Sequence, residues 1–180
     1  MALLMLKDLP RYECLLHAAE RYPSLDPRAF EAFLHLLRTG DTVFAGVQEF
    51  LTEHGVSQGR FTVLTLLDRC FDEPLTPAAL ADEACVTRAT MTGLIDTLEK
   101  DGLAARETDP GDRRTVLVRL TAKGRAFLDR TLPDYCRRVS AMLEPLSETE
   151  QKQLVRLLQK IQQGLAPNPA RARPALAKGV

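Results

Sequence analysis

Positive charge is concentrated in the stretch TDPGDRRTVLVRLTAKG, residues 108–124. Arg113 and Arg114 directly follow the DPGD segment, and no acidic residue lies between them and Arg125. A guanidinium at the tip of a turn can bind a phosphate with two hydrogen bonds or enter the narrow minor groove of DNA. We expect Asp112 to pair with Arg114 and hold it extended. The alternative is a solvated, charge-rich turn in which the acids only cap the backbone.

A second group of candidate contact residues lies upstream, at the start of a helix predicted over residues 87–100. Its outward N-terminal half is small or hydroxylated, which suits a helix in the major groove. Threonine hydroxyls there can reach bases or phosphates, and free amides at the helix start can hold a phosphate beside a cation. The candidate DNA contacts on this helix are Thr87, Arg88, Ala89, Thr90, Thr92 and Gly93. Those beyond it are Arg106, Asp112, Arg113 and Arg114.

The same helix also fits a plain structural role. Its opposite face is apolar, with Met91, Leu94, Ile95 and Leu98. A helix with one apolar and one small outer face is also typical of an ordinary surface helix. The elements around it favour DNA binding.

These candidate residues lie on a predicted winged helix-turn-helix. Thr76 and Pro77 predict the start of a helix that reaches about residue 84, and Thr87 predicts the start of the next one after a very short turn. Two strands follow, at 103–107 and 114–120, joined by the DPGD turn, in which proline presets φ and Gly111 is expected to supply a positive φ. Val116, Val118 and Leu120 are expected to share one face. Three further cations are expected to reach the DNA backbone: Arg119, Lys123 and Arg125.

Long helices are predicted on both sides of this central block. Helices are expected over 8–22, 26–54 and 57–71 before it, and over 121–143 and from Ser147 to about 165 after it. Pro133 is expected to kink the helix that contains it, and Ser147 with Glu150 forms a capping box. The last helix carries a narrow apolar stripe: Leu154, Leu157, Leu158, Ile161 and Leu165.

The predicted fold class is therefore mainly α with a small β-hairpin wing. Four regions are expected: N-terminal helices at 1–56, a winged helix-turn-helix domain at 57–125, C-terminal helices at 126–165 and a disordered basic tail at 166–180. The N- and C-terminal helices expose more apolar area than monomers usually do, which predicts a homodimer. A two-fold dimer would separate the two recognition helices by about 34 Å and would match a pseudo-palindromic operator in double-stranded DNA.

Composition and motifs exclude several other classes of protein. The 180 residues contain 24 Lys plus Arg and 24 Asp plus Glu, so any affinity for nucleic acid must come from local charge. No long apolar run and no signal-peptide core is present, so we expect a cytoplasmic protein with no membrane association. The four cysteines are far apart, and none of the usual catalytic motifs occurs. We expect no enzyme activity, no cofactor and no metal.

The run LTPAALADEACVTRATMTGLIDTLEKDGLAARETDPGDRRTVLVRLTAKGRAFL resembles the multiple-antibiotic-resistance regulator (MarR) family of bacterial transcription factors. The resemblance covers roughly residues 55–165 and is most specific in LEKDGL, DPGDRR and VRLTAKG. It implies a dimeric repressor that leaves DNA when a small, often anionic aromatic ligand binds. It also implies that 87–97 is the recognition helix, that Arg114 is the wing arginine and that Asp112 orients it. Gly93 and Thr97 depart from the family, which commonly carries larger polar residues there.

A ligand pocket between the lobes is expected to use Phe50, His54, Arg60 and Phe61, since the arginine could pair with a carboxylate and the rings could flank an aromatic group. The alternative is that both phenylalanines are core residues and Arg60 is a surface residue. Two other functions stay open. One is a winged-helix protein-interaction module that does not read DNA sequence. The other is oxidant sensing through Cys14, although burial as a small hydrophobic residue is the more common fate of such a thiol.

Overall fold

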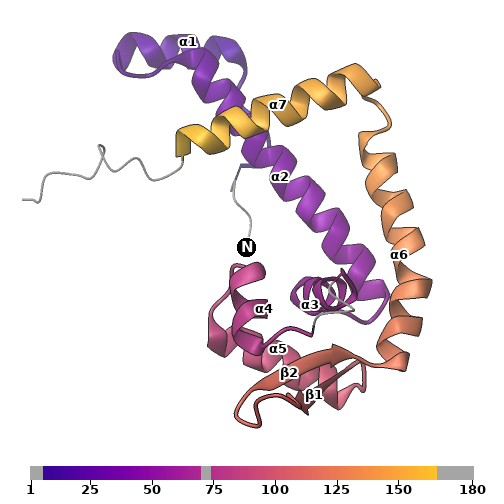
Figure 1. Ribbon diagram of the computed structural model, residues 1–180. Coiled ribbons are helices and arrows are strands. Elements are labelled where there is room, and N and C mark those ends of the chain that lie inside the picture. The colour runs from indigo at the N-terminus through magenta and orange to yellow at the C-terminus, as the bar shows by residue number, and fades with distance from the viewer. Residues whose placement is uncertain (1–5, 70–73, 166–180) are drawn as a thin grey trace, which may run out of the picture. The chain divides into compact units, whose positions relative to one another are not determined.

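The computed structural model describes residues 6–69 and 74–165 of the chain (Figure 1). Within these ranges, five helices precede one two-stranded antiparallel sheet and two helices follow it, which confirms the predicted fold class. The elements are α1 (Tyr12–Arg21), α2 (Pro27–Glu53), α3 (Gln58–Arg69), α4 (Pro77–Glu83), α5 (Arg88–Lys100), β1 (Ala104–Thr108), β2 (Val116–Leu120), α6 (Ala122–Leu143) and α7 (Glu148–Leu165). The predicted basic tail at 166–180 and the end of the third predicted helix at 70–71 lie outside the described residues.

The helix starts follow the capping residues that the sequence predicts. The Asp26 carboxylate accepts hydrogen bonds from the amides of Arg28 at 3.0 Å and Ala29 at 3.3 Å, with a proline in the first turn of α2. Thr76 caps α4 in the same way. The first helix begins later than predicted, at Tyr12. Pro10 disfavours helical backbone at Leu9, so the predicted start at residue 8 is unfavourable.

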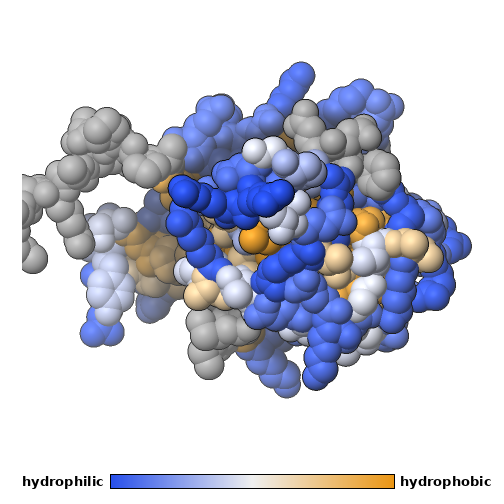
Figure 2. All heavy atoms as spheres, turned by 60° about the horizontal axis from the view of Figure 1, so that its bottom comes forward, coloured by the Kyte–Doolittle hydropathy of each residue, from blue (hydrophilic) through white to orange (hydrophobic). Residues whose placement is uncertain are grey.

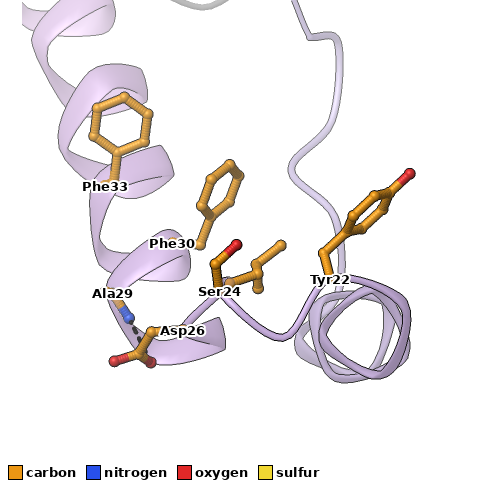
Figure 3. A pocket seen from close by; sticks show the side chains of 7 residues that line it. Tyr22, Ser24, Asp26, Ala29, Phe30 and Phe33 are labelled. Carbon is orange, nitrogen blue, oxygen red and sulfur yellow. Dashed lines mark hydrogen bonds between the residues drawn. The ribbon is translucent and has the colours of Figure 1, made fainter.

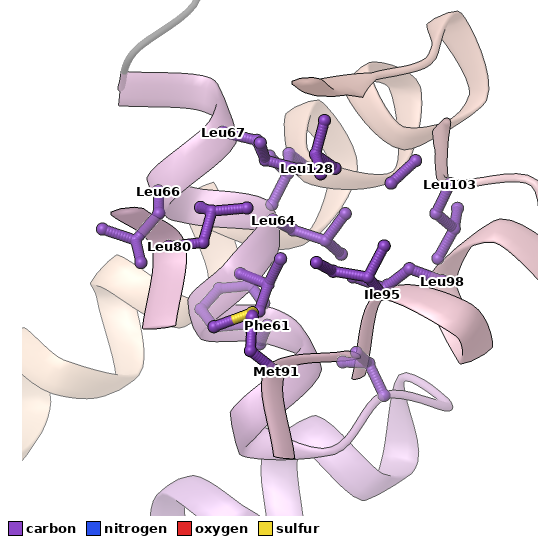
Figure 4. Close-up of a cluster of buried hydrophobic side chains, with 14 of the residues drawn as sticks. Phe61, Leu64, Leu66, Leu67, Leu80, Met91, Ile95, Leu98, Leu103 and Leu128 are labelled. Atoms are coloured by element: carbon purple, nitrogen blue, oxygen red, sulfur yellow. The ribbon is translucent and has the colours of Figure 1, made fainter. Parts of the chain in front are cut away.

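The core of the first compact unit lies between α3, α4, α5, the hairpin and the first half of α6 (Figure 4). Met91, Ile95 and Leu98 of α5 are fully buried, and their spacing of three or four residues puts them on one face of the helix. They pack in one cluster with Leu64 of α3 and Leu128 of α6. Burial of this face requires the opposite face of α5 to point outward.

The second strand of the hairpin is shorter than predicted, and burial does not simply alternate along it. Leu117 and Val118 are both buried, whereas Val116 is 43% exposed. Val116, Val118 and Leu120 are alternate residues of one regular strand, as predicted, but burial along that face ends before Val116. Val116 lies at the tip end of β2, beyond the part of the strand that packs on the core, whereas the middle of β2 is covered on both faces.

The loop between the strands spans residues 109–115 and closes with a bond from the Asp109 amide to the Thr115 carbonyl at 3.0 Å. The Asp109 carboxylate accepts from the Gly111 amide at 2.7 Å. In the described ranges, positive φ occurs at Gly55, Gly102 and Cys85, so the prediction of a positive φ at Gly111 is wrong. The side chain of Asp109 shapes this turn instead of an unusual glycine conformation.

Gly124 places the start of α6 directly against the hairpin. A Cβ atom built at Gly124 would lie 2.0 Å from the carbonyl oxygen of Leu103 and 2.8 Å from the Leu120 side chain. No side chain fits this space, so glycine is required for the close approach. The predicted kink at Pro133, which lies inside α6, stays a prediction.

The chain divides into two compact units, Met1–Tyr135 and Cys136–Val180. In the second unit, the predicted capping box is present: the Ser147 amide donates to Glu150 Oε2 at 2.8 Å, and the Glu150 amide donates to Ser147 Oγ at 3.4 Å. The bonds from the Ser147 hydroxyl and amide lower the pKa of Glu150. The apolar stripe of α7 is exposed at Leu154, Leu157, Ile161 and Leu165.

Cys14 is exposed, so the expected burial of this thiol is wrong. The reason is local, because the residue that α1 buries is the neighbouring Leu15. Oxidant sensing through Cys14 stays a hypothesis. None of the helices in the described ranges has both the length and the apolar character needed to cross a bilayer.

Candidate nucleic-acid interface

The outward face of α5 carries the predicted contact residues. Arg88, Ala89, Thr90, Thr92 and Gly93 are all exposed. A Cβ atom built at Gly93 would meet nothing within 4 Å, so this position is open to solvent. The face is small and accessible, as the sequence predicts for a helix that enters a groove.

The start of α5 is closed by a threonine cap. Thr87 Oγ1 accepts from the Thr90 amide at 3.1 Å, and the two threonine hydroxyls lie 2.8 Å apart. The Thr90 amide is therefore already bonded, and a phosphate at this helix start would have to use the amides of Arg88 and Ala89.

Thr92 has a more restricted role than the sequence suggests. Its hydroxyl donates to the Arg88 carbonyl at 2.9 Å. A hydroxyl has one proton and phosphate oxygens only accept, so in this rotamer Thr92 cannot donate to a phosphate. Its free lone pair can accept from a base amino group, and its methyl group can contact thymine.

A groove joins α5 to the tip of the hairpin. Its volume is about 460 Å³, and its described lining is Thr76, Pro77, Ala78, Arg88, Thr92, Arg114, Thr115 and Val116. Arg88 and Arg114 thus face one space although they lie on different elements, and none of these lining residues is acidic. Figure 2 presents the side of the molecule that bears α5 and the hairpin, and most of its visible surface is hydrophilic. The start of α4 lines this groove although none of its residues is among the predicted DNA contacts.

Asp112 organises the tip through the backbone. Its carboxylate accepts from the Arg114 amide at 3.0 Å and from the Thr115 hydroxyl at 2.9 Å. Both bonds lower the pKa of Asp112, and the bond from the Arg114 amide has the larger effect. The carboxylate therefore holds Arg114 by its amide and not by the side-chain pair that the sequence predicted. Arg113 and Arg114 are both exposed.

The cations beyond the tip are bonded within the protein. Arg119 Nε lies 2.6 Å from Glu107 Oε2, and Lys123 Nζ donates to the Asp101 carbonyl at 2.7 Å. Arg125 pairs with Asp68 of α3. These contacts give the three side chains structural partners. Their expected contact with the DNA backbone stays a prediction.

Arg106 also has acidic partners. Its guanidinium lies 2.7 Å from Asp96 Oδ1 and pairs with Glu99. Desolvation by burial lowers the pKa of Arg106, but the hydrogen bond to Asp96 and the charges of both acids outweigh it and raise the pKa. The Arg106 side chain thus links β1 to α5 through these two ion pairs. Contact of Arg106 with DNA stays a prediction.

Three of the four predicted ligand-binding residues lie together. The ring centroids of Phe50 and His54 are 4.2 Å apart. The ring centroid of Tyr135 lies 5.0 Å from that of Phe61 and 6.1 Å from that of Phe50. Both phenylalanines are buried in the core. Tyr135 was not predicted, because it is distant in the chain and reaches the cluster only through the packing of α6.

Arg60, the fourth predicted ligand-binding residue, is directed elsewhere. Its guanidinium pairs with Asp101, at the end of α5, and its side chain is only 15% exposed. In the described ranges, no group of three or more side chains could hold a metal ion.

Comparison with known proteins identifies the chain's relatives. The model of the MarR family matches residues 56–116. The HTH-type transcriptional repressor YetL of Bacillus subtilis is 35% identical over 153 residues, which cover 85% of this chain and 92% of YetL. The chain belongs to the MarR family. The curated relatives of this MarR-family chain are named as transcriptional regulators and not as enzymes.

Solved structures of MarR-type regulators share this fold. Sco3205 from Streptomyces coelicolor, solved in complex with DNA, superposes with a TM-score of 0.71 at 24% identity, covering 81% of this chain and 96% of Sco3205. BpsR from Bordetella bronchiseptica, whose DNA binding is regulated by 6-hydroxynicotinic acid, has a TM-score of 0.61 at 29% identity, covering 71% of this chain and 91% of BpsR. The winged helix-turn-helix prediction is confirmed.

The wing tip of this MarR-family chain should titrate at low pH. Because the pKa of Asp112 is lowered from its ordinary value of 3.8, the tip bonds should be intact above that value and lost as the pH falls through the lowered pKa. An NMR pH titration of the Asp112 carboxyl group should have its midpoint below 3.8. Thr115→Val removes one donor and should move the midpoint upward, whereas Thr108→Val should leave it unchanged. An unchanged midpoint in Thr115→Val would contradict the bond.

Proposed function

We propose that this chain is a dimeric, sequence-specific DNA-binding transcriptional regulator, and specifically a repressor. The observation that carries the proposal is the groove in which Arg88 and Thr92 of α5 face Arg114 of the hairpin tip. YetL, which is 35% identical to this chain, is named as a transcriptional repressor, and this supports repression as the mode of regulation.

The groove suggests how the two elements divide the work. The exposed face of α5 is small enough to lie in the major groove, where Thr92 accepts from base amino groups and Ala89 contacts thymine methyls. Arg114 extends from the tip toward the neighbouring minor groove or a phosphate. With 24 cations and 24 anions the chain has no net charge, so its nonspecific attraction to DNA is weak and these local contacts carry the binding.

The wing arginine can be tested against a matched control. Arg114→Ala should weaken binding to an operator fragment by roughly 1 to 3 kcal/mol. Arg119→Ala removes the same charge from the same hairpin. Because the Arg119 guanidinium pairs with Glu107, any contact that it makes with the DNA backbone competes with this pair, so its loss should cost less than about 1 kcal/mol. Fluorescence anisotropy on fragments selected from a random DNA pool measures both, and the dimer should stay intact.

Two outcomes would contradict the proposal. Equal operator affinity for Arg114→Ala and the parent protein would remove the wing from the interface. Failure of the parent to enrich any sequence at moderate salt would favour a winged-helix protein-interaction module instead.

Dimerisation is proposed from apolar surface that the described residues leave uncovered. On α2, Phe30, Phe33, Val43 and Phe44 are between 43% and 50% exposed. A pocket of about 550 Å³ beside the start of α2 is lined in part by Tyr22, Phe30 and Phe33 (Figure 3). The exposed stripe of α7 adds a second apolar surface. A second copy of the chain that covers these surfaces would bury them and pair two recognition helices for a pseudo-palindromic site.

The dimer proposal predicts opposite behaviour for two substitutions on α7. Leu157→Lys puts a charge in the exposed apolar stripe and should shift the protein toward monomer in sedimentation velocity experiments. Gln159→Lys puts the same charge about 200° away around the helix and should leave the dimer intact. A parent protein that sediments as a monomer, or a Leu157→Lys variant that stays as dimeric as the parent, would contradict the proposal.

We also propose that a small aromatic anion relieves DNA binding. The regulation of BpsR by 6-hydroxynicotinic acid supports this class of ligand. Within the described residues, Arg60 Nε is buried and has no hydrogen-bond partner, while the rest of its guanidinium holds Asp101 at the end of α5. A carboxylate that took Arg60 from Asp101 would break this tie between α3 and the end of α5.

The ligand proposal is tested with 6-hydroxynicotinic acid and hydroxybenzoates as probes. At least one probe should lower the operator affinity of the parent. Arg60→Met should abolish that response, whereas Arg69→Met, which removes an exposed pair with Glu83, should retain it. An Arg60→Met protein that responds like the parent would exclude this arginine as the anion's partner.

A further inference from the structure

The hairpin is bonded along both of its outer edges at one register position. Arg106 and Val118 are paired across the two strands. The Val118 amide points away from β1 and donates to the Leu75 carbonyl at 2.9 Å. The Arg106 amide is bonded on the other edge, where it donates to Glu99 Oε1 at 2.8 Å. A side chain of the recognition helix thus occupies the place that a third strand would take.

Glu99 uses both of its oxygens on the same residue. Oε1 accepts from the backbone amide of Arg106, and Oε2 pairs with its guanidinium. Asp96, one turn earlier on α5, lies 2.7 Å from the same guanidinium. The Glu99 and Arg106 side chains are 31% and 29% exposed, so the pair is partly shielded from water and is stronger than a surface ion pair.

The carboxylates of Asp96 and Glu99 constrain the orientation of β1 relative to α5 as well as the distance between them. Apolar packing of Leu103 and Ala104 already holds the base of the hairpin in the core, but such contacts are nondirectional. Hydrogen bonds to an amide and a guanidinium constrain the direction of β1 relative to α5. The Glu107–Arg119 pair, by contrast, stays within the hairpin and places no constraint on α5.

We infer that Glu99 is a positioning residue that clamps the wing to the recognition helix, so that Arg88 and Arg114 meet DNA as one preorganised surface. This inference rests on the proposed DNA-binding function. Without Glu99, the hairpin would have to become ordered when DNA binds. The free-energy cost of this ordering would reduce the binding free energy that Arg114 contributes. The penalty of losing Arg114 should therefore depend on Glu99, although Glu99 itself lies outside the groove.

A double-mutant cycle on the full-length protein measures this dependence. In the parent, Arg114→Ala should reduce operator affinity roughly 5- to 150-fold. In a Glu99→Ala background the same substitution should cost about 2-fold or less. Glu99→Gln keeps an oxygen for the Arg106 amide but loses the ion pair. In this background the affinity lost on Arg114→Ala should therefore be intermediate. Glu107→Ala is the matched control and should leave the Arg114 penalty within about 2-fold of the parent value.

A change in global stability alone would not produce this pattern. Affinities are referred to the active fraction of each folded variant, so partial unfolding lowers that fraction without changing the Arg114 penalty. Hydrogen exchange in the DNA-free protein gives a second readout. The Arg106 amide should exchange slowly in the parent and faster in Glu99→Ala, whereas the Val118 amide should stay protected.

The outcomes separate this inference from the proposed function. A parent that binds its operator, with an equal Arg114 penalty in the parent, Glu99→Gln and Glu99→Ala, overturns the clamp and leaves the regulator intact. A fast-exchanging Arg106 amide in the parent also overturns the clamp. A parent that enriches no DNA sequence overturns the DNA-binding function and the inference with it.

Discussion

Burial of one face of α5 is the constraint on which the rest of the interface depends. Met91, Ile95 and Leu98 are fully buried, and each contributes roughly 1.5 to 3 kcal/mol of hydrophobic stabilisation. No other rotation of α5 about its axis buries all three, so the side that carries Arg88 and Thr92 must face outward. The surface that we propose contacts DNA is the geometric complement of the core.

The fold pairs some charged side chains within the protein and leaves others exposed for contact with a partner. The central block has many cations, but Arg106, Arg119 and Arg125 pair with acids, and Lys123 holds a backbone carbonyl. Arg114 is held by its amide through Asp112, which leaves its exposed guanidinium facing the groove with Arg88. A protein with no net charge can therefore still present a local cationic surface to DNA.

The fold was largely predictable because its signals are local. Caps at Asp26, Thr76 and Thr87 and the Ser147 capping box predicted the helix starts, and the change from helical to alternating periodicity predicted the hairpin. Errors arose where a local pattern meets tertiary packing. Cys14 is exposed because α1 buries Leu15, and the turn at Gly111 is shaped by the Asp109 side chain.

The sequence by itself determined the order of the elements, the position of α5 and the arginines of the hairpin tip, because capping, periodicity and turn chemistry act between neighbours in the chain. The tertiary structure decided which charged groups are available. Glu99 with Arg106, Arg60 with Asp101, and the joint lining of one groove by Arg88 and Arg114 all join residues on different elements. Their pairing depends on how α3, α5 and the hairpin pack, and no spacing along the chain encodes those distances.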